Sequence, residues 1–104
     1  MIGQYSPNYL YNEISVRLNA PDSWGVYYCG TLNPNGSLFP YYVGRASDQN
    51  VTVKSRLLDH IRVGEWPDIT HFVFVTCSTS QEAEQFEMTE IARLNNPKYN
   101  KRLG

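Results

Sequence analysis

The distribution of apolar and polar residues predicts a β-hairpin in the first half of the chain. The runs "GVYYCGTL" (residues 25–32) and "SLFPYYVG" (residues 37–44) are rich in β-branched and aromatic residues and flank the turn sequence "NPNG". Pro34 suits the first corner of a turn, and Gly36 suits a following left-handed position. Because Pro40 cannot donate a hydrogen bond to a ladder, the second strand is expected to be irregular or at an edge there.

An additional strand is predicted before this hairpin. In "EISVRLN" (residues 13–19), Ile14, Val16 and Leu18 alternate with polar residues, and this period of two is typical of a half-buried strand. We therefore expect residues 1–22 to form an N-terminal arm or extra edge strand, followed by one domain of residues 23–104.

The next segment has the periodicity of a helix. Within residues 52–63, Val53, Leu57 and Ile61 recur at helical spacing, and Gly64 is well placed to end the helix. The spacing predicts a first helix over these residues.

A strand and a second helix complete the pattern. "HFVFVTC" (residues 71–77) is a nearly continuous apolar run, typical of a central strand. Thr79 and Glu82 form a capping-box pattern that opens a helix running to residue 95 or 96, ahead of Pro97. The predicted fold class is α/β in the broad sense, more narrowly α+β: a small three-stranded antiparallel sheet flanked by helices, with the N-terminal strand as an optional addition.

Composition narrows the class of protein. A chain of 104 residues can bury one core, and it contains no apolar run near the length of a membrane span and no basic, apolar start typical of a signal peptide. We therefore expect a cytoplasmic protein without a membrane partner. Cys29 and Cys77 are far apart in sequence, which favours reduced buried thiols over a disulfide or a zinc site.

The charge distribution is uneven. The net charge of -1 argues against bulk electrostatic coating of nucleic acid, yet four of the nine basic residues lie within residues 45–62. On charge alone, a solvated helix face is the simpler explanation for them. They are Arg45, Lys54, Arg56 and Arg62.

Several side chains break the packing pattern of the helices. On the second helix, Glu87 and Glu90 fall on the apolar stripe that should face the sheet, where a carboxylate is costly unless it is paired or binds a metal. Glu87 is the acid that most needs a partner, unless it reaches solvent at the sheet edge. On the first helix, Arg56 and His60 share one face and can act on one group together, although a surface cation and a half-exposed ring are the simpler explanation.

Two glycines break the pattern of the strands. By strand alternation, Gly25 shares a face with Tyr27, and Gly44 shares a face with Tyr42, so each tyrosine lies beside a position without a side chain. Either a ligand approaches this surface closely or the rings pack across the strands.

The register of the hairpin decides whether these tyrosines meet. A two-residue loop would place Tyr27 opposite Tyr42, whereas the three-residue loop indicated by Gly36 would offset them by one and turn them to opposite faces. With the longer loop, a bulge near Phe39 and Pro40 is needed to return both tyrosines to one face.

Taken together, these motifs resemble the GIY-YIG endonuclease family in their order and spacing. In "YVGRA", the second motif continues with a basic residue and alanine, as in the incision domain of a bacterial excision-repair nuclease of that family. The interval between the two tyrosines is longer than is usual in the family. The matching segments are "GVY" (25–27), "YVG" (42–44), Arg56 with His60, Glu87 and "NPKYN" (96–100).

The resemblance implies a fold, an activity and a set of site residues. It implies the GIY-YIG nuclease fold and hydrolysis of DNA phosphodiester bonds, with Mg²⁺ or Mn²⁺ bound by Glu87. It implies that Tyr27 acts as general base, that Tyr42 orients the water or phosphate, and that Arg56 complements negative charge. His60 would hold the phosphate or shuttle a proton. Substrate contacts are expected from Arg45, Asn100, Lys54 and Arg62.

Two further expectations concern specificity and activity. No separate DNA-recognition domain follows the matching segments, so specificity would come from a homodimer or from a fused or separate partner. The alternative function is a catalytically inactive module that keeps the fold and binds nucleic acid or another protein.

Overall fold

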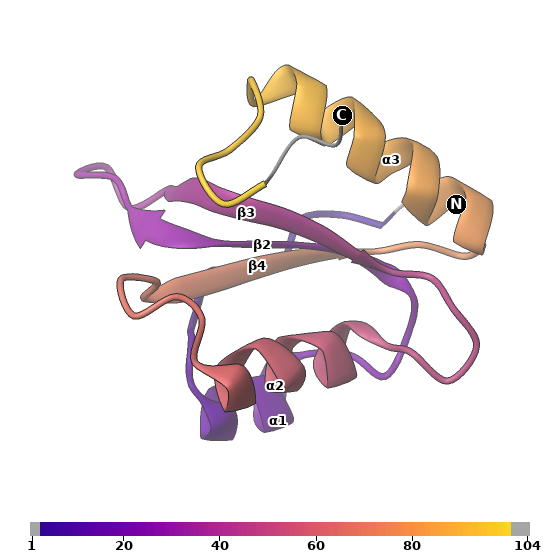
Figure 1. Ribbon diagram of the computed structural model, residues 1–104, viewed down its shortest axis with the longest axis horizontal. Helices are drawn as coiled ribbons and strands as arrows, with labels where there is room; N and C mark the ends of the chain where they lie inside the picture. Colours follow the sequence, from indigo (N-terminus) through magenta and orange to yellow (C-terminus); the bar gives the residue numbers. More distant parts are fainter. Residues whose placement is uncertain (1–2, 101–104) are drawn as a thin grey trace.

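The structure is a computed structural model that describes residues 3–100, and it has a mixed α+β architecture. A four-stranded antiparallel sheet has the strand order β1-β4-β2-β3, so β3 forms one edge (Figure 1). The elements are β1 (Tyr9–Leu10), α1 (Glu13–Asn19), β2 (Gly25–Leu32), β3 (Leu38–Ala46), α2 (Val53–Val63), β4 (His71–Thr76) and α3 (Ser80–Arg93).

Helices cover both faces of the sheet. Helices α1 and α2 lie against one face and α3 lies against the other (Figure 1). Strand alternation gives each face its own core: Tyr27, Cys29 and Leu57 are buried on the side of α2, whereas Val26, Tyr28 and other residues are buried on the side of α3. Cys29 and Cys77 are free, buried thiols, as the sequence predicts.

The predicted strand at residues 13–19 is wrong, because this segment is helix α1. Asn12 caps the helix, since its side-chain oxygen accepts a hydrogen bond from the backbone N–H of Ser15 at 2.8 Å. Ile14 and Leu18 are 74% and 79% exposed, and the buried residue of α1 is Val16. The apparent alternation therefore did not mark a buried face.

The N-terminal strand is shorter and earlier than predicted. Strand β1 contains Tyr9–Leu10 and pairs with β4, with Tyr9 opposite Phe72 and Leu10 opposite His71. It lies at the sheet edge opposite β3 and extends the three-stranded sheet that the sequence predicts.

The hairpin between β2 and β3 has the longer loop and the bulge. Asn33 and Ser37 close the turn by an N–H to carbonyl bond of 2.7 Å, and Gly36 has a φ of 89°. Pairing runs from Leu32 opposite Leu38 to Gly30 opposite Pro40, and then shifts so that Cys29 is opposite Tyr42. Tyr41 is the extra residue, which confirms the predicted irregularity beside Pro40.

Helix α3 begins at its predicted capping sequence, and α2 begins within one residue of the start that its periodicity predicts. Thr52 caps α2 and Thr79 caps α3, each accepting a backbone N–H three residues on. Gly64 ends α2 with a left-handed φ of 71°. Helix α3 ends at Arg93, slightly before the predicted end at residue 95 or 96.

Glu90, rather than Glu87, is the most deeply buried carboxylate on α3. Its Oε1 accepts hydrogen bonds from the Tyr28 hydroxyl at 2.7 Å and the Tyr5 hydroxyl at 2.8 Å. Arg93 also donates to both carboxylate oxygens. These donors hold the pKa of Glu90 at about 2, with the bond from Arg93 as the largest cause. The network ties the N-terminal arm, β2 and α3 together.

We expect Glu90→Gln to lower the free energy of unfolding at pH 7 by about 1–3 kcal/mol, because the buried hydroxyl of Tyr28 loses a charged acceptor. A carboxyl group with a depressed pKa stabilises the fold above its unfolded value of about 4.5 and loses this effect as pH falls toward about 2. The difference between wild type and variant in urea denaturation should therefore shrink below pH 4.5.

Glu84→Gln is the matched control, because Glu84 is an exposed glutamate of the same helix. A Glu90→Gln protein as stable as wild type at pH 7, or a stability difference that stays constant down to pH 3, would contradict this role for Glu90.

Candidate active site

A polar pocket of about 580 Å³ lies beside edge strand β3. Its wall combines Tyr42 and Arg45 from β3, Arg56 from α2 and Glu87 from α3, so it joins the two helical layers around the edge of the sheet. The remaining lining residues belong to α2 or to the segment between β3 and α2, and they are Ser47, Asp48, Asn50, Val51, Ser55 and Asp59.

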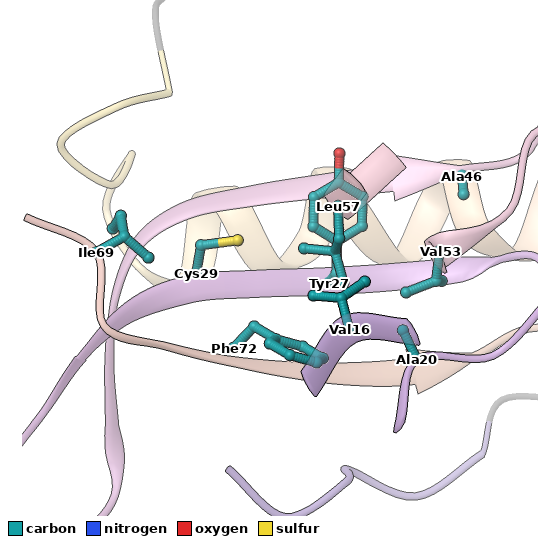
Figure 2. Packing of buried hydrophobic residues seen from close by; sticks show 9 residues of the cluster. All are labelled: Val16, Ala20, Tyr27, Cys29, Ala46, Val53, Leu57, Ile69 and Phe72. Carbon is teal, nitrogen blue, oxygen red and sulfur yellow. The ribbon is translucent and has the colours of Figure 1, made fainter. Parts of the chain in front are cut away.

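Tyr27 is not among the residues that line this pocket. It is fully buried, and Figure 2 shows it in the cluster that includes Leu57 and Val16. The bulge at Tyr41 places Tyr42 on the same face, and the ring centroids of Tyr27 and Tyr42 are 6.1 Å apart. The predicted convergence of both tyrosines on one face is confirmed, but only Tyr42 lines the pocket.

Gly44 makes room for both rings. A Cβ atom there would lie 2.6 Å from Cζ of Tyr27 and 2.7 Å from Cε2 of Tyr42. The surface left clear by this glycine is therefore occupied by tyrosine side chains, which is the cross-strand packing alternative for this position.

Arg56 and His60 both interact with the phenol group of Tyr27. The hydroxyl of Tyr27 lies 3.0 Å from Nε2 of His60, and Arg56 interacts with the same phenol. His60 is 8% exposed, so it is a buried ring rather than the half-exposed one that helix position alone suggests. Arg56 also lines the pocket, and it therefore connects the buried phenol to the open site.

Burial dominates the electrostatics of the two phenols. It raises the pKa of Tyr27 well above the usual range, and Arg56 offsets only part of the effect. The pKa of Tyr42 is also raised, chiefly by burial, with Arg56 again acting in the opposite direction. Neither phenol ionises readily in this setting, so proton transfer through them requires a basic acceptor.

Glu65 and Trp66 were not among the predicted site residues, yet both contact His60. Glu65 Oε1 lies 2.5 Å from His60 Nδ1, and the Trp66 ring centroid lies 4.4 Å from that of His60. Gly64 ends α2 immediately before them and donates its N–H to the carbonyl oxygen of His60. The glycine cap is a sequence signal that the helix ends here, but it does not give the direction that the chain then takes.

Glu87 is held at the pocket wall by Arg45. Arg45 Nη1 donates to Glu87 Oε1 at 2.9 Å, and 16% of the Glu87 side chain is exposed. Burial raises the pKa of Glu87, and Arg45 opposes this shift. The predicted need for a partner is thus met by a cation from the neighbouring strand.

Within residues 3–100, no group of three or more His, Cys, Asp and Glu side chains is arranged to hold a metal ion. The side chains of these residues therefore do not provide a metal centre that is coordinated by protein atoms alone. A single half-buried carboxylate does fit the demands of Mg²⁺, which retains several waters and is commonly held by one or two carboxylates together with substrate phosphates.

The other predicted substrate contacts lie away from the pocket wall. Asn100 accepts from the backbone N–H of Val43 and donates to its carbonyl oxygen, both at 2.8 Å, and so pairs with the edge of β3. Lys54 pairs with Asp22 at 3.5 Å, and Arg62 pairs with Asp59 at 3.1 Å. Contacts of these three residues with a substrate stay predictions.

Comparisons with protein-family models, with curated proteins and with solved structures found no match for this chain. None of the helices within residues 3–100 has both the length and the apolar character needed to cross a membrane.

We expect Gly44→Ala to destabilise the fold by about 1–3 kcal/mol, because the added methyl group overpacks the two tyrosine rings. Thermal denaturation measures the effect. Gly36→Ala at the hairpin turn is the comparison, since a Cβ there meets no atom within 4 Å and only its φ of 89° opposes the change. A Gly44→Ala protein with wild-type stability would show that the tyrosines do not fill this space.

Proposed function

We propose that this protein is a metal-dependent endonuclease of the GIY-YIG family that hydrolyses phosphodiester bonds in DNA. The observation that carries the proposal is the bulge at Tyr41, which brings the two motif tyrosines to one face beside Arg56. The order of the sequence motifs supports the family assignment, and the polar pocket at the edge of β3 supports a site for a phosphate group.

The cations of the pocket suit a phosphodiester. Arg56 is a planar, permanently charged donor that can stabilise negative charge as it develops on phosphorus-bound oxygens. Arg45 stands beside it in the wall and is already oriented by Glu87. Arg45 therefore already has an anionic partner in Glu87, and a bound phosphate would be the anionic partner of Arg56.

Glu87 is the residue that would hold the metal ion. Its carboxylate reaches the pocket wall from α3, and Arg45 contacts only one of its oxygens, Oε1, in the bond described above. When bound, Mg²⁺ or Mn²⁺ supplies Lewis acidity to the phosphate and to the departing oxygen. DNA is the partner in this proposal, and a second copy of the chain or another protein would add sequence specificity.

The proton path starts at Tyr42, because it is the tyrosine that lines the pocket. As the water attacks phosphorus, its proton moves to Tyr42 while the Tyr42 proton moves to Tyr27. The Tyr27 proton then moves to Nε2 of His60, 3.0 Å away. The raised pKa values of both phenols favour this relay over a stable phenolate at either position. Tyr27 acts as a base only within this chain of transfers.

We expect Glu87→Gln to abolish metal-dependent nicking of plasmid DNA, because the variant loses the carboxylate charge that would bind the ion. Arg56→Ala should lower the cleavage rate by about a hundredfold or more, as expected for a lost preorganised donor. Gel analysis of plasmid nicking with Mg²⁺, Mn²⁺ or EDTA measures both effects.

Two controls lie outside the pocket: Glu84→Gln on α3 and Arg17→Ala on α1, both at exposed positions. Both should cleave like wild type. Full activity of a folded Glu87→Gln protein would refute the assignment of the metal site, and activity undiminished by EDTA would refute metal dependence.

We expect the Glu87→Gln protein to bind duplex DNA weakly, with affinity falling as salt rises. Each phosphate contact contributes about −0.9 to the slope of log K against log[salt], and among residues 3–100 only Arg45 and Arg56 line the pocket as cations. Fluorescence anisotropy of a labelled duplex over a salt series measures the slope. Tight, salt-independent binding would contradict this interface and indicate another surface, such as residues 3–22 or a dimer.

A catalytically inactive module is the second candidate function. The ion pair between Arg45 and Glu87 favours it, because the pair satisfies the proposed metal-binding carboxylate without a metal. In that case DNA would bind without being cut under any metal condition, and Glu87→Gln would leave binding unchanged.

A further inference from the structure

The contacts of His60 continue beyond the residues used so far and reach the loop after α2. His60 has one ring nitrogen on Tyr27 and the other on Glu65, so it bridges a buried phenol and a carboxylate. Glu65 is 41% exposed through its side chain, whereas the His60 side chain is 9% exposed. The chain of contacts therefore runs from solvent to the buried Tyr27.

We infer that Glu65 is the positioning residue of the proposed nuclease site: it fixes the His60 ring with its proton on Nδ1, so that Nε2 can accept the proton of Tyr27. This inference rests on the proposed function for its catalytic meaning. The orientation of the ring itself follows from the contacts alone.

The short distance to Glu65 decides the tautomer. A carboxylate has only acceptor oxygens, so an unprotonated Nδ1 facing it at 2.5 Å would set two lone pairs against each other. Nδ1 must therefore carry a proton and donate it to Glu65. In the neutral ring this leaves Nε2 without a proton, and Nε2 then accepts the hydrogen bond from the Tyr27 hydroxyl.

The neutral ring is the resting form near pH 7. Burial is the largest influence and lowers the pKa of His60, Arg56 acts in the same direction, and Glu65 opposes them. Asp59 on the same helix also raises the pKa, while Tyr27 and Tyr42 face the ring from β2 and β3. A neutral His60 is ready to accept a proton, and Glu65 stabilises the imidazolium that results.

Packing holds the ring in this orientation. The ring of Trp66 lies over His60 with an interplanar angle of 30°, and the centroid of Tyr42 is 5.4 Å from that of His60. The glycine cap at Gly64 directs the chain so that Glu65 and Trp66 both return to the last turn of α2. One loop thus supplies the carboxylate that orients the ring and the aromatic face that covers it.

Every proton that moves in the hydrolysis step has a donor and an acceptor. The attacking water gives one proton to the tyrosines, one proton passes from Tyr27 to Nε2 of His60, and the Nδ1 proton stays shared with Glu65. Hydroxide forms the new P–O bond as the bond to the 3′-oxygen breaks. His60 later returns its added proton to solvent, and the departing oxygen takes one from solvent.

The first test reads the tautomer without requiring activity. Long-range ¹H–¹⁵N spectra of ¹⁵N-histidine-labelled protein at pH 7.5 should show His60 protonated at Nδ1 and bare at Nε2. The chain has two histidines, and His71 serves as the internal reference, with His71→Gln assigning the signals. Glu65→Ala should shift His60 away from this tautomer and leave His71 unchanged. A wild-type His60 protonated at Nε2 would overturn the inference.

The second test follows cleavage against pH. Since His60 must be neutral to accept a proton, log kcat should rise with pH through its pKa and reach a plateau. Glu65→Ala should lower the plateau by about tenfold or more and move the rising limb to lower pH, because Glu65 raises the pKa of His60. Glu65→Asp should restore part of the rate, and Glu13→Gln, at an exposed site on α1, should change nothing.

The two tests separate the inference from the proposed function. No cleavage by wild-type protein would refute the proposed function, while the spectrum would still decide how Glu65 orients His60. If wild type cleaves and Glu65→Ala has an unshifted pH profile or full activity, the positioning role of Glu65 is refuted although the nuclease stands.

Discussion

The single extra residue in β3 is the constraint on which the candidate site depends. Side chains alternate strictly along a strand, so a three-residue hairpin loop by itself would turn Tyr27 and Tyr42 to opposite faces of the sheet. The bulge at Tyr41 restores the parity, and Pro40 beside it has no N–H that the ladder could lose. Gly44 then leaves the space in which the two rings meet.

Two carboxylates on one face of α3 show how similar residues take different roles. Glu90 is fully engaged: two phenols and Arg93 saturate it, its pKa falls to about 2, and it binds three segments of the fold together. Within residues 3–100, Glu87 is hydrogen-bonded to Arg45 at the wall of a pocket. A structural carboxylate is thus distinguished from a candidate metal ligand by its partners and its position rather than by its type.

Much of the fold could be predicted from local sequence. The caps at Thr52, Thr79 and Gly64, the turn glycine Gly36 and the break at Pro40 each act through backbone geometry that a residue type dictates nearby. Helix α1 could not be recognised in this way, because an exposed helix of seven residues needs only Val16 and Ala20 to face the core. Ile14 and Leu18 of this helix are exposed to solvent, and together with Val16 they give the alternation of apolar and polar residues that is typical of a strand.

The candidate site was predictable only in part, for a related reason. Arg56 and His60 lie one helical turn apart, so their common target could be anticipated from spacing. Glu65 and Trp66 follow the helix in a loop, and no periodicity connects them to His60. Their contacts arise from the direction that the chain takes after Gly64, which is a tertiary effect.

The bulge at Tyr41 requires one register for the hairpin, and cross-strand nuclear Overhauser effects measure that register directly. With the bulge at Tyr41, Cys29 should show cross-strand contacts to Tyr42, and the ring protons of Tyr27 should show contacts to those of Tyr42. Contacts that place Cys29 opposite Tyr41, with no contact between the two rings, would put the tyrosines on opposite faces. That result would contradict the shared site and the chemistry proposed for it.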